Sequence, residues 1–181
     1  MLKTRSMRWN YTQNTNRIMV TFSILVKKYK TASCKVGGCR MIKVEFHRAE
    51  PLNISLTYVV IAARHNGQWL FVRHKERSTY EIPGGHIEPE EDYISAAKRE
   101  LYEETGAQEF TLDFVSIYTV AKDEKTSGGY LFFADVKELS VLPDYEMAEV
   151  VLMEQLPVNL TYPLIQPYLF NQVLGWTVPS P

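Results

Sequence analysis

The chain has little cysteine, no excess of charge of either sign and no long apolar run. Its two cysteines, Cys34 and Cys39, are too few for a disulfide framework, and we therefore expect a protein of the reducing cytoplasm. The 20 basic residues nearly balance the 21 acidic ones, so that the net charge is −1. This balance excludes an acidic disordered chain and predicts no nucleic-acid polymer as a partner.

The longest apolar stretch, residues 18–26, is interrupted by Thr21 and Ser23. It is much shorter than the roughly 20 residues needed to cross a bilayer, and we expect no membrane association. A chain of 181 residues with 45% apolar residues is sufficient to build one packed core.

Residues 1–40 are rich in polar and basic residues and show no sustained hydrophobic period. This pattern predicts a poorly ordered N-terminal extension, followed by one domain over residues 41–181. A lipoprotein signal ending at Cys39 is disfavoured, because four lysines separate the apolar stretch from that cysteine. Cys34 and Cys39 are interpreted as incidental thiols; the alternative, half of a zinc site with His47, lacks a fourth ligand.

From Met41 onward the sequence predicts a mixture of strands and helices. The turn signal at residues 65–67 predicts a hairpin, and the turn-forming stretch 123–129 predicts an antiparallel pair. The expected strands are 43–46, 57–63, 69–73, 110–120, 130–136 and 150–153, and the expected helices are 88–105 and 163–174. In the first helix we expect Pro89 in the first turn, Gly106 as the C-terminal cap, and a buried stripe of Ile94, Ala97 and Leu101.

The first predicted helix carries three carboxylates on one side. Glu100, Glu103 and Glu104 fall within an arc of roughly 100°, and such like charges destabilise a helix slightly. Arg99 can pair with Glu103 four residues later, which leaves two carboxylates free to bind a divalent cation. Oxygen ligands favour Mg²⁺ or Mn²⁺ over zinc. The alternative is a solvated acidic helix face.

The segment before this helix, residues 82–85, ends in a Gly-Gly pair whose backbone can approach a ligand closely. The full pattern runs Gly85, five residues, Glu91, seven residues, Arg99-Glu100-Leu101, one residue, Glu103-Glu104, one residue, Gly106 and an apolar residue. It resembles the Nudix box at every defining position. With seven fixed residues, a chance match is on the order of one in a million.

The resemblance implies a fold of mixed class (α+β or α/β), an α/β/α sandwich around a mixed β-sheet over about residues 41–175. It also implies an enzyme that hydrolyses nucleoside diphosphates linked to another group, with Mg²⁺ or Mn²⁺ as cofactor. Glu100, Glu103 and Glu104 match the family's metal ligands. Arg99 would orient these carboxylates, Glu91 would hold Arg99 and the loop, and Gly85 and Gly106 match backbone positions of the motif.

Hydrolysis requires a carboxylate that accepts a proton from the attacking water. The resemblance leaves this general base open between a glutamate of the box and an acid on a later loop. Within residues 144–149, Glu146 is the first candidate and Glu149 the second. A solvated loop acid is the alternative for both.

The substrate is inferred from resemblance to subgroups of the family. Residues 118–126 lack the downstream proline of ADP-ribose enzymes and the tyrosine of dinucleoside polyphosphate enzymes, and residues 69–77 do not match the coenzyme A pattern. The upstream run is similar to mutator-type enzymes of Gram-positive bacteria. We therefore expect a (deoxy)nucleoside triphosphate, including one with an oxidised purine, to be cleaved to monophosphate and pyrophosphate.

Two alternatives remain at this stage: a hydrolase of ADP-ribose or nucleotide sugars, and a non-catalytic nucleotide-binding module. A homodimer is also left open. Candidate base contacts are Tyr80, Tyr130 and Phe132, with core packing as the alternative. Candidate phosphate contacts are Arg73, Lys75 and Arg77, with a solvated surface as the alternative.

Overall fold

The computed structural model describes residues 27–35, 38–48, 50–51 and 53–177. Within them, the elements in chain order are β1 (Lys27–Lys35), β2 (Gly38–His47), β3 (Leu56–His65), β4 (Gln68–His74), β5 (Gly84–His86), α1 (Tyr93–Thr105), β6 (Ala107–Lys122), β7 (Lys125–Leu139), β8 (Met147–Met153) and α2 (Gln166–Thr177). No helix in these residues is long and apolar enough to span a membrane.

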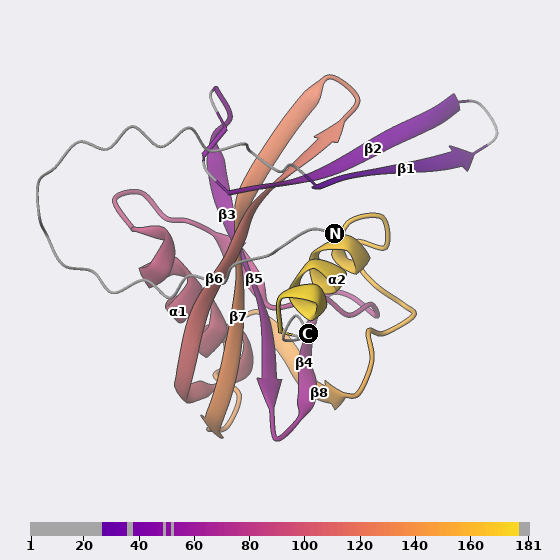
Figure 1. The fold of residues 1–181 in the computed structure, drawn as a ribbon. Helices are drawn as coiled ribbons and strands as arrows, with labels where there is room; N and C mark the ends of the chain where they lie inside the picture. Colours follow the sequence, from indigo (N-terminus) through magenta and orange to yellow (C-terminus); the bar gives the residue numbers. More distant parts are fainter. Residues whose placement is uncertain (1–26, 36–37, 49, 52, 178–181) are drawn as a thin grey trace, which may run out of the picture.

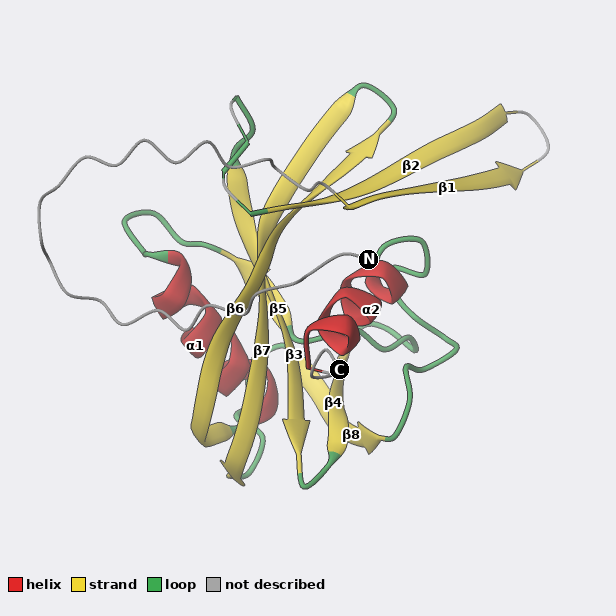
Figure 2. Ribbon diagram, viewed as in Figure 1, coloured by secondary structure: helices red, strands yellow, loops and turns green. Residues whose placement is uncertain are grey.

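The strands form one mixed sheet with a helix on each face (Figures 1 and 2). The strand order is β1-β2-β6-β7-β3-β4-β8, and β5 pairs with β3 outside this path. β3 and β7 run parallel, whereas the other neighbouring strands are antiparallel. Helix α1 covers one face and α2 the other, which confirms the predicted α/β/α sandwich.

The core has two halves, because successive side chains of a strand point to opposite faces of the sheet. On one face, Val59, Ile61 and Ala63 of β3 pack in the same cluster as the buried apolar residues of α1. On the other face, Ala62 packs in a cluster with Leu169, which belongs to α2. The buried α1 residues are Ala96, Ala97, Leu101 and Thr105.

The predicted hairpin is present, and it opens towards its far end. Asn66 and Gly67 have φ values of 49° and 85°, as a two-residue turn with positive φ at both positions requires. β3 and β4 pair only at the two residue pairs next to this turn. Beyond it, residues 81–86 run between the two strands: the Ile61 N–H donates to the Pro83 carbonyl at 2.8 Å, and the Val72 N–H donates to the Glu81 carbonyl at 3.0 Å. The Gly-Gly segment therefore lies in the middle of the sheet.

Helix α1 begins at Tyr93, so the prediction of a helix from residue 88 was wrong. Asp92 is the N-cap, and its Oδ1 accepts from the Ile94 and Ser95 N–H groups at 2.9 and 3.1 Å. Glu90 has a φ of 67°, which no α-helix tolerates, and Pro89 therefore precedes the helix.

The C-terminal end of α1 agrees with the prediction. Gly106 adopts the left-handed conformation with φ 74°, and its N–H donates to the Tyr102 carbonyl at 2.8 Å. The predicted buried stripe is wrong at one position, since Ile94 is 43% exposed. Ala96 is buried as well, next to the expected Ala97.

The pairing of β6 with β7 is antiparallel, as predicted, but both strands are longer than expected. The turn is only Asp123 and Glu124, and residues 125–129 are paired with β6. Asp123 takes a φ of 56° to close this turn. Backbone pairing therefore overrides the weak strand propensity of the Ser-Gly-Gly segment at residues 127–129.

The closing helix is also shifted towards the C-terminus. Residues 163–165 form a turn, in which the Ile165 N–H donates to the Tyr162 carbonyl at 3.1 Å, and α2 starts at Gln166. Pro167 lies in the first turn, where its missing N–H would have no intrahelical partner. The predicted strand at 150–153 is present and begins earlier, at Met147.

The structure differs from the expected extension over residues 27–35 and 38–40, which are strands. β2 pairs with β6 and β1 pairs with β2, in a register that places Cys34 opposite Cys39. Hydrophobic periodicity does not indicate such pairing, because backbone groups alone can add strands to a sheet edge. Residues 1–26 lie outside the described part.

The third residue of the alternative zinc site is His47. Its Nε2 forms a hydrogen bond of 2.9 Å with Thr119 Oγ1.

Candidate active site

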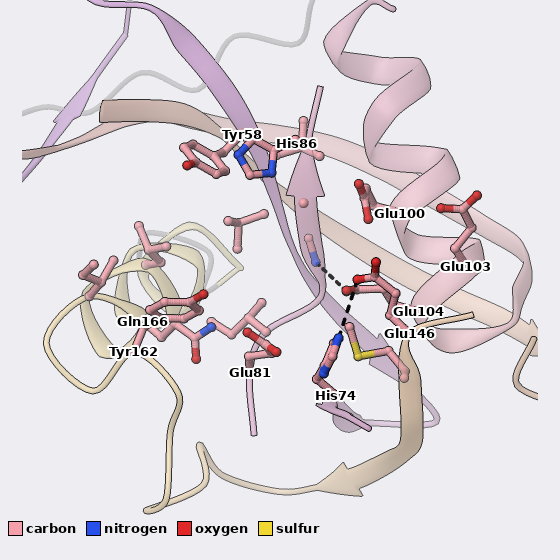
Figure 3. A pocket seen from close by; sticks show the side chains of 18 of the residues that line it. Tyr58, His74, Glu81, His86, Glu100, Glu103, Glu104, Glu146, Tyr162 and Gln166 are labelled. Carbon is pink, nitrogen blue, oxygen red and sulfur yellow. Dashed lines mark hydrogen bonds and ion pairs between the residues drawn. The ribbon is translucent and has the colours of Figure 1, made fainter. Parts of the chain in front are cut away.

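A cavity of about 690 Å³ lies between α1, α2 and the segment that separates β3 from β4 (Figure 3). Six carboxylates line it, and they come from four parts of the chain. They are Glu81 from the inserted segment, Glu88 from the loop before α1, Glu100, Glu103 and Glu104 from α1, and Glu146 from the loop before β8. The sequence-predicted cluster therefore faces a cavity, not bulk solvent.

Glu104 is the innermost of the helix carboxylates. Its Oε2 accepts a hydrogen bond from the Gly84 N–H at 2.8 Å, which ties the helix to the glycine segment. Burial raises the pKa of Glu104 well above its usual value, the Gly84 bond opposes this rise, and the neighbouring carboxylates Glu100, Glu81 and Glu146 add to it.

Arg99 connects the helix to the loop that precedes it. Its Nε and Nη2 donate to the two carboxylate oxygens of Glu91 at 3.0 and 2.8 Å, and Nη2 also donates to the His86 carbonyl at 3.0 Å. Its Nη1 donates to Glu100 Oε1 at 2.9 Å and to Glu103 Oε2 at 3.2 Å. The Arg99–Glu103 pair that the spacing predicts is thus present. Glu91 holds the guanidinium group of Arg99 in place, and the hydrogen bonds that Arg99 donates lower the pKa of Glu91.

Gly85 makes room for the carboxylate of Glu100. A Cβ at this position would lie 2.3 Å from Glu100 Oε1, far inside van der Waals contact. Burial raises the pKa of Glu100, and its hydrogen bond with Arg99 opposes the rise. The glycine of the motif therefore has a steric role, which is to let the loop pass directly beneath this carboxylate.

We expect Gly85→Ala to lower kcat at least tenfold with little change in Tm. The added methyl group displaces only the flexible end of Glu100, which moves a carboxylate without unpacking the core. Gly175→Ala in α2 is the matched control, because nothing lies within 4 Å of a Cβ there and alanine favours a helix. Steady-state kinetics and thermal melts of both variants test this; full activity of Gly85→Ala would contradict the steric role.

The donor set of the helix fits a divalent cation of the Mg²⁺ class. All three donors are carboxylates, and Glu104 is buried beside three further carboxylates. Each of these neighbours lies next to a basic side chain: Glu81 next to Arg77, Glu100 next to Arg99, and Glu146 next to His74. In the described part of the chain, no three His, Cys, Asp or Glu side chains are arranged to hold a metal ion as they stand. Arg99 Nη1 binds one oxygen of Glu100 and one of Glu103.

The two candidates for a later general base occupy different environments. Glu146 lines the cavity, is 80% exposed, and lies 3.8 Å from His74 Nε2. Glu149 points elsewhere: its Oε1 accepts from Arg73 Nε at 2.7 Å and from the Tyr80 hydroxyl at 2.9 Å. The bond from Arg73 lowers the pKa of Glu149. Only Glu146 is brought to the cavity.

Among the basic residues considered as phosphate contacts, Arg77 lines the cavity and pairs with Glu81 at 2.9 Å. Arg73 is held by Glu149, and Lys75 pairs with Asp144 at 2.5 Å outside the cavity.

The aromatic residues considered as base contacts lie away from this cavity. Tyr130 and Phe132 stack on Tyr93 of α1, with ring centroids 4.2 and 6.3 Å apart, and Tyr80 bonds to Glu149. None of the three is therefore brought to this cavity. Sequence spacing could not show that Tyr130 and Phe132 pack in the cluster on the α1 face of the sheet.

Sequence reasoning missed Glu81 and the opposite wall of the cavity. Glu81 is only 8% exposed; burial raises its pKa, and Arg77 opposes the rise. A signal was available, since a charged residue between Tyr80 and Ile82 interrupts a strand-like run. The opposite wall includes Tyr58, Tyr162 and Gln166, and no motif marks these residues.

The part of the sequence that forms this cavity matches a known domain family. The model of the NUDIX domain matches residues 55–169, which include the glycine segment, α1 and the start of α2. The chain belongs to the NUDIX domain family and is a Nudix hydrolase.

Relatives and solved structures agree with this assignment. A Bacillus subtilis protein named as a candidate 8-oxo-dGTP diphosphatase, YtkD, is 39% identical over 113 residues, which cover 62% of this chain and 71% of the relative. The crystal structure of the Bacillus subtilis pyrophosphohydrolase BsRppH has a TM-score of 0.63 at 28% identity and covers 75% of this chain and 92% of that one. An ADP-ribose pyrophosphatase from Streptococcus suis shares the fold, with a TM-score of 0.50 at 12% identity and coverage of 68% and 92%.

Proposed function

We propose that the protein cleaves a purine (deoxy)nucleoside triphosphate, including one with an oxidised guanine, to the monophosphate and pyrophosphate in the presence of Mg²⁺. The observation that carries the proposal is the division of one cavity into two ends. Carboxylates held by Arg99 line one end, and aromatic and apolar side chains line the other. The name of the Bacillus subtilis relative supports the same substrate class. We place the catalytic unit within residues 41–181 and the protein in the cytoplasm.

In this proposal Glu100, Glu103 and Glu104 hold the metal. A bound divalent ion would screen the phosphate charge and lower the pKa of a water molecule. Arg99 keeps Glu100 and Glu103 on the cavity side of α1, and Glu91 holds Arg99 in place. Glu146 is the proposed proton acceptor, because it is exposed at the cavity and His74 lies beside it. Arg77, whose N–H donates to the His74 carbonyl, also lines the cavity and supplies a positive charge for phosphate oxygens.

The proposal is tested by the ratio of kcat/KM values for two substrate classes. We expect dGTP or 8-oxo-dGTP to be turned over with a kcat/KM at least tenfold above that for ADP-ribose. Preference for ADP-ribose, with release of AMP, would overturn the substrate and leave the hydrolase class unchanged.

Mg²⁺ is expected to raise the Tm of the wild-type protein. A ligand that binds only the folded state at ten times its Kd adds RT ln 11, about 1.4 kcal/mol, or roughly 3–6 °C for a domain of this size. Thermal melts with Mg²⁺ and with excess chelator measure this shift. The same shift in Glu104→Gln would show that the ion binds elsewhere.

A further inference from the structure

Glu146 reaches the cavity from a loop that lies against the end of β4. Its side chain is 80% exposed, so packing alone does not fix the carboxylate. β4 and β8 are antiparallel, and their register shifts just before His74, which lies opposite Met147. The shift leaves one residue of β8 without an opposite partner, and such a bulge redirects the strand end beside it. His74 is thereby placed next to the loop that carries Glu146.

Lys75 ties the backbone of this loop to the end of β4 through three hydrogen bonds. Its N–H donates to the Glu146 carbonyl at 3.0 Å. Its ammonium group donates to the Tyr145 carbonyl at 2.6 Å and to Asp144 Oδ1 at 2.5 Å. Each residue from 144 to 146 is therefore held by Lys75. These bonds fix the backbone that carries Glu146 but not its carboxylate.

The His74 ring presents an N–H to that carboxylate. The Glu76 N–H donates to His74 Nδ1 at 3.1 Å, so Nδ1 is the acceptor nitrogen of the ring and the hydrogen is on Nε2. Nε2 lies 3.8 Å from Glu146 Oε2, and both residues line the cavity (Figure 3). This separation is longer than a hydrogen bond, and a rotation of the exposed Glu146 side chain closes it.

We propose that His74 and Lys75 position Glu146 for proton transfer, an inference that rests on the proposed function. Lys75 sets where the loop lies, and the Nε2–H of His74 holds the carboxylate in one orientation. Glu146 accepts the proton of the attacking water, and neither His74 nor Lys75 gains or loses one. A general base must lie within hydrogen-bond reach of the proton that it accepts. A misplaced base slows the chemical step and leaves substrate binding unchanged.

His74→Phe keeps a flat ring and removes the N–H, whereas His74→Gln restores an N–H donor. We expect His74→Phe to lower kcat about tenfold, the size of a hydrogen bond to a charged group, with KM changed less than about twofold. His74→Gln should recover most of the lost kcat. His65→Phe is the matched control, because His65 also bonds through its ring but does not line the cavity. An unchanged kcat in His74→Phe, or a change in KM alone, overturns the inference.

Lys75→Met removes the two bonds of the ammonium group and should lower kcat about threefold, as for an exposed ion pair. Lys137→Met is its control, because Lys137 pairs with Asp135 and neither residue lines the cavity. It should have wild-type kcat. An equal loss in both variants overturns the role of Lys75.

Combination with Glu146→Gln tests whether His74 acts through Glu146. Since Glu146→Gln removes the base, His74→Phe should change kcat less than about twofold in that background. A full loss in both backgrounds overturns the inference, because His74 would then act on the substrate itself. Wild-type turnover by Glu146→Gln also overturns it, since there would be no base to position.

¹⁵N NMR of the imidazole needs no turnover and separates this inference from the proposed function. We expect the Nε2–H tautomer of His74, with an Nε2 resonance that moves in Glu146→Gln and not in Glu124→Gln. The Nδ1–H tautomer, or a resonance that does not move, overturns the inference. Failure of the wild type to hydrolyse any triphosphate overturns the proposed function, while the tautomer and its response to Glu146→Gln would still support the role of His74.

Discussion

Replacing Glu104 with Gln is expected to lower kcat about a hundredfold or more while the fold stays intact. The substitution preserves shape and removes the charge of the innermost helix carboxylate. Loss of one group that stabilises charge in the transition state costs about 3 kcal/mol. The Gly84 N–H can still donate to the amide oxygen, so the link between helix and loop is retained. Steady-state kinetics at saturating substrate and Mg²⁺ measure the effect.

The same variant should be at least as stable as the wild type without metal. Since burial raises the pKa of Glu104 in the folded state, the folded protein binds a proton more tightly than the unfolded chain does. The stability that protonation provides is present below the unfolded pKa of about 4.3 and is lost as pH rises through the folded pKa. The advantage of Glu104→Gln in Tm should therefore be larger at pH 8 than at pH 4.

Glu124→Gln serves as the control for charge removal, because Glu124 lies in the exposed turn between β6 and β7. It should have wild-type kcat at every Mg²⁺ concentration. Wild-type turnover by Glu104→Gln would refute the assignment of the α1 carboxylates to catalysis.

Arg99→Met should reduce both activity and stability. Arg99 is 24% exposed on its side chain and pairs with three carboxylates, so its removal leaves Glu91, Glu100 and Glu103 to repel one another. For a partly buried network we expect a loss of about 2 kcal/mol, or roughly 4–8 °C in Tm. The freed carboxylates also lose their orientation, and kcat should fall at least tenfold.

Arg99→Lys and Lys98→Met separate charge from geometry. Lysine keeps the charge but cannot donate the paired bonds to Glu91, so it should restore stability more than activity. Lys98 is the exposed neighbour that lines a different surface depression, next to Tyr93 and Phe110. Its replacement should leave both properties unchanged. A stable and fully active Arg99→Met would show that the carboxylates do not need this clamp.

Helix α1 was the part of the molecule that the sequence could predict best. Its acidic face is set by a fixed angle per residue, and Gly106 ends the helix because it adopts a left-handed conformation. The N-terminal end was misplaced because Asp92, not the acids before it, caps the helix. Periodicity shows where a helix faces the core but does not show where its first turn begins.

The opposite wall of the cavity could not be predicted, because its residues come together only through the topology. Tyr58 lies in β3, whereas Tyr162 and Gln166 lie about a hundred residues later, just before α2 and at its first residue. The insertion of residues 81–86 between β3 and β4 likewise depends on long-range pairing that no local pattern encodes. The same insertion brings Glu81 into the cavity.

Identification of the products of GTP hydrolysis by ³¹P NMR, with Mg²⁺ and then with excess chelator, tests the central claim most directly. The account predicts GMP and pyrophosphate with Mg²⁺, and no hydrolysis once the ion is removed. Release of GDP and inorganic phosphate, or full turnover in the presence of chelator, would contradict it.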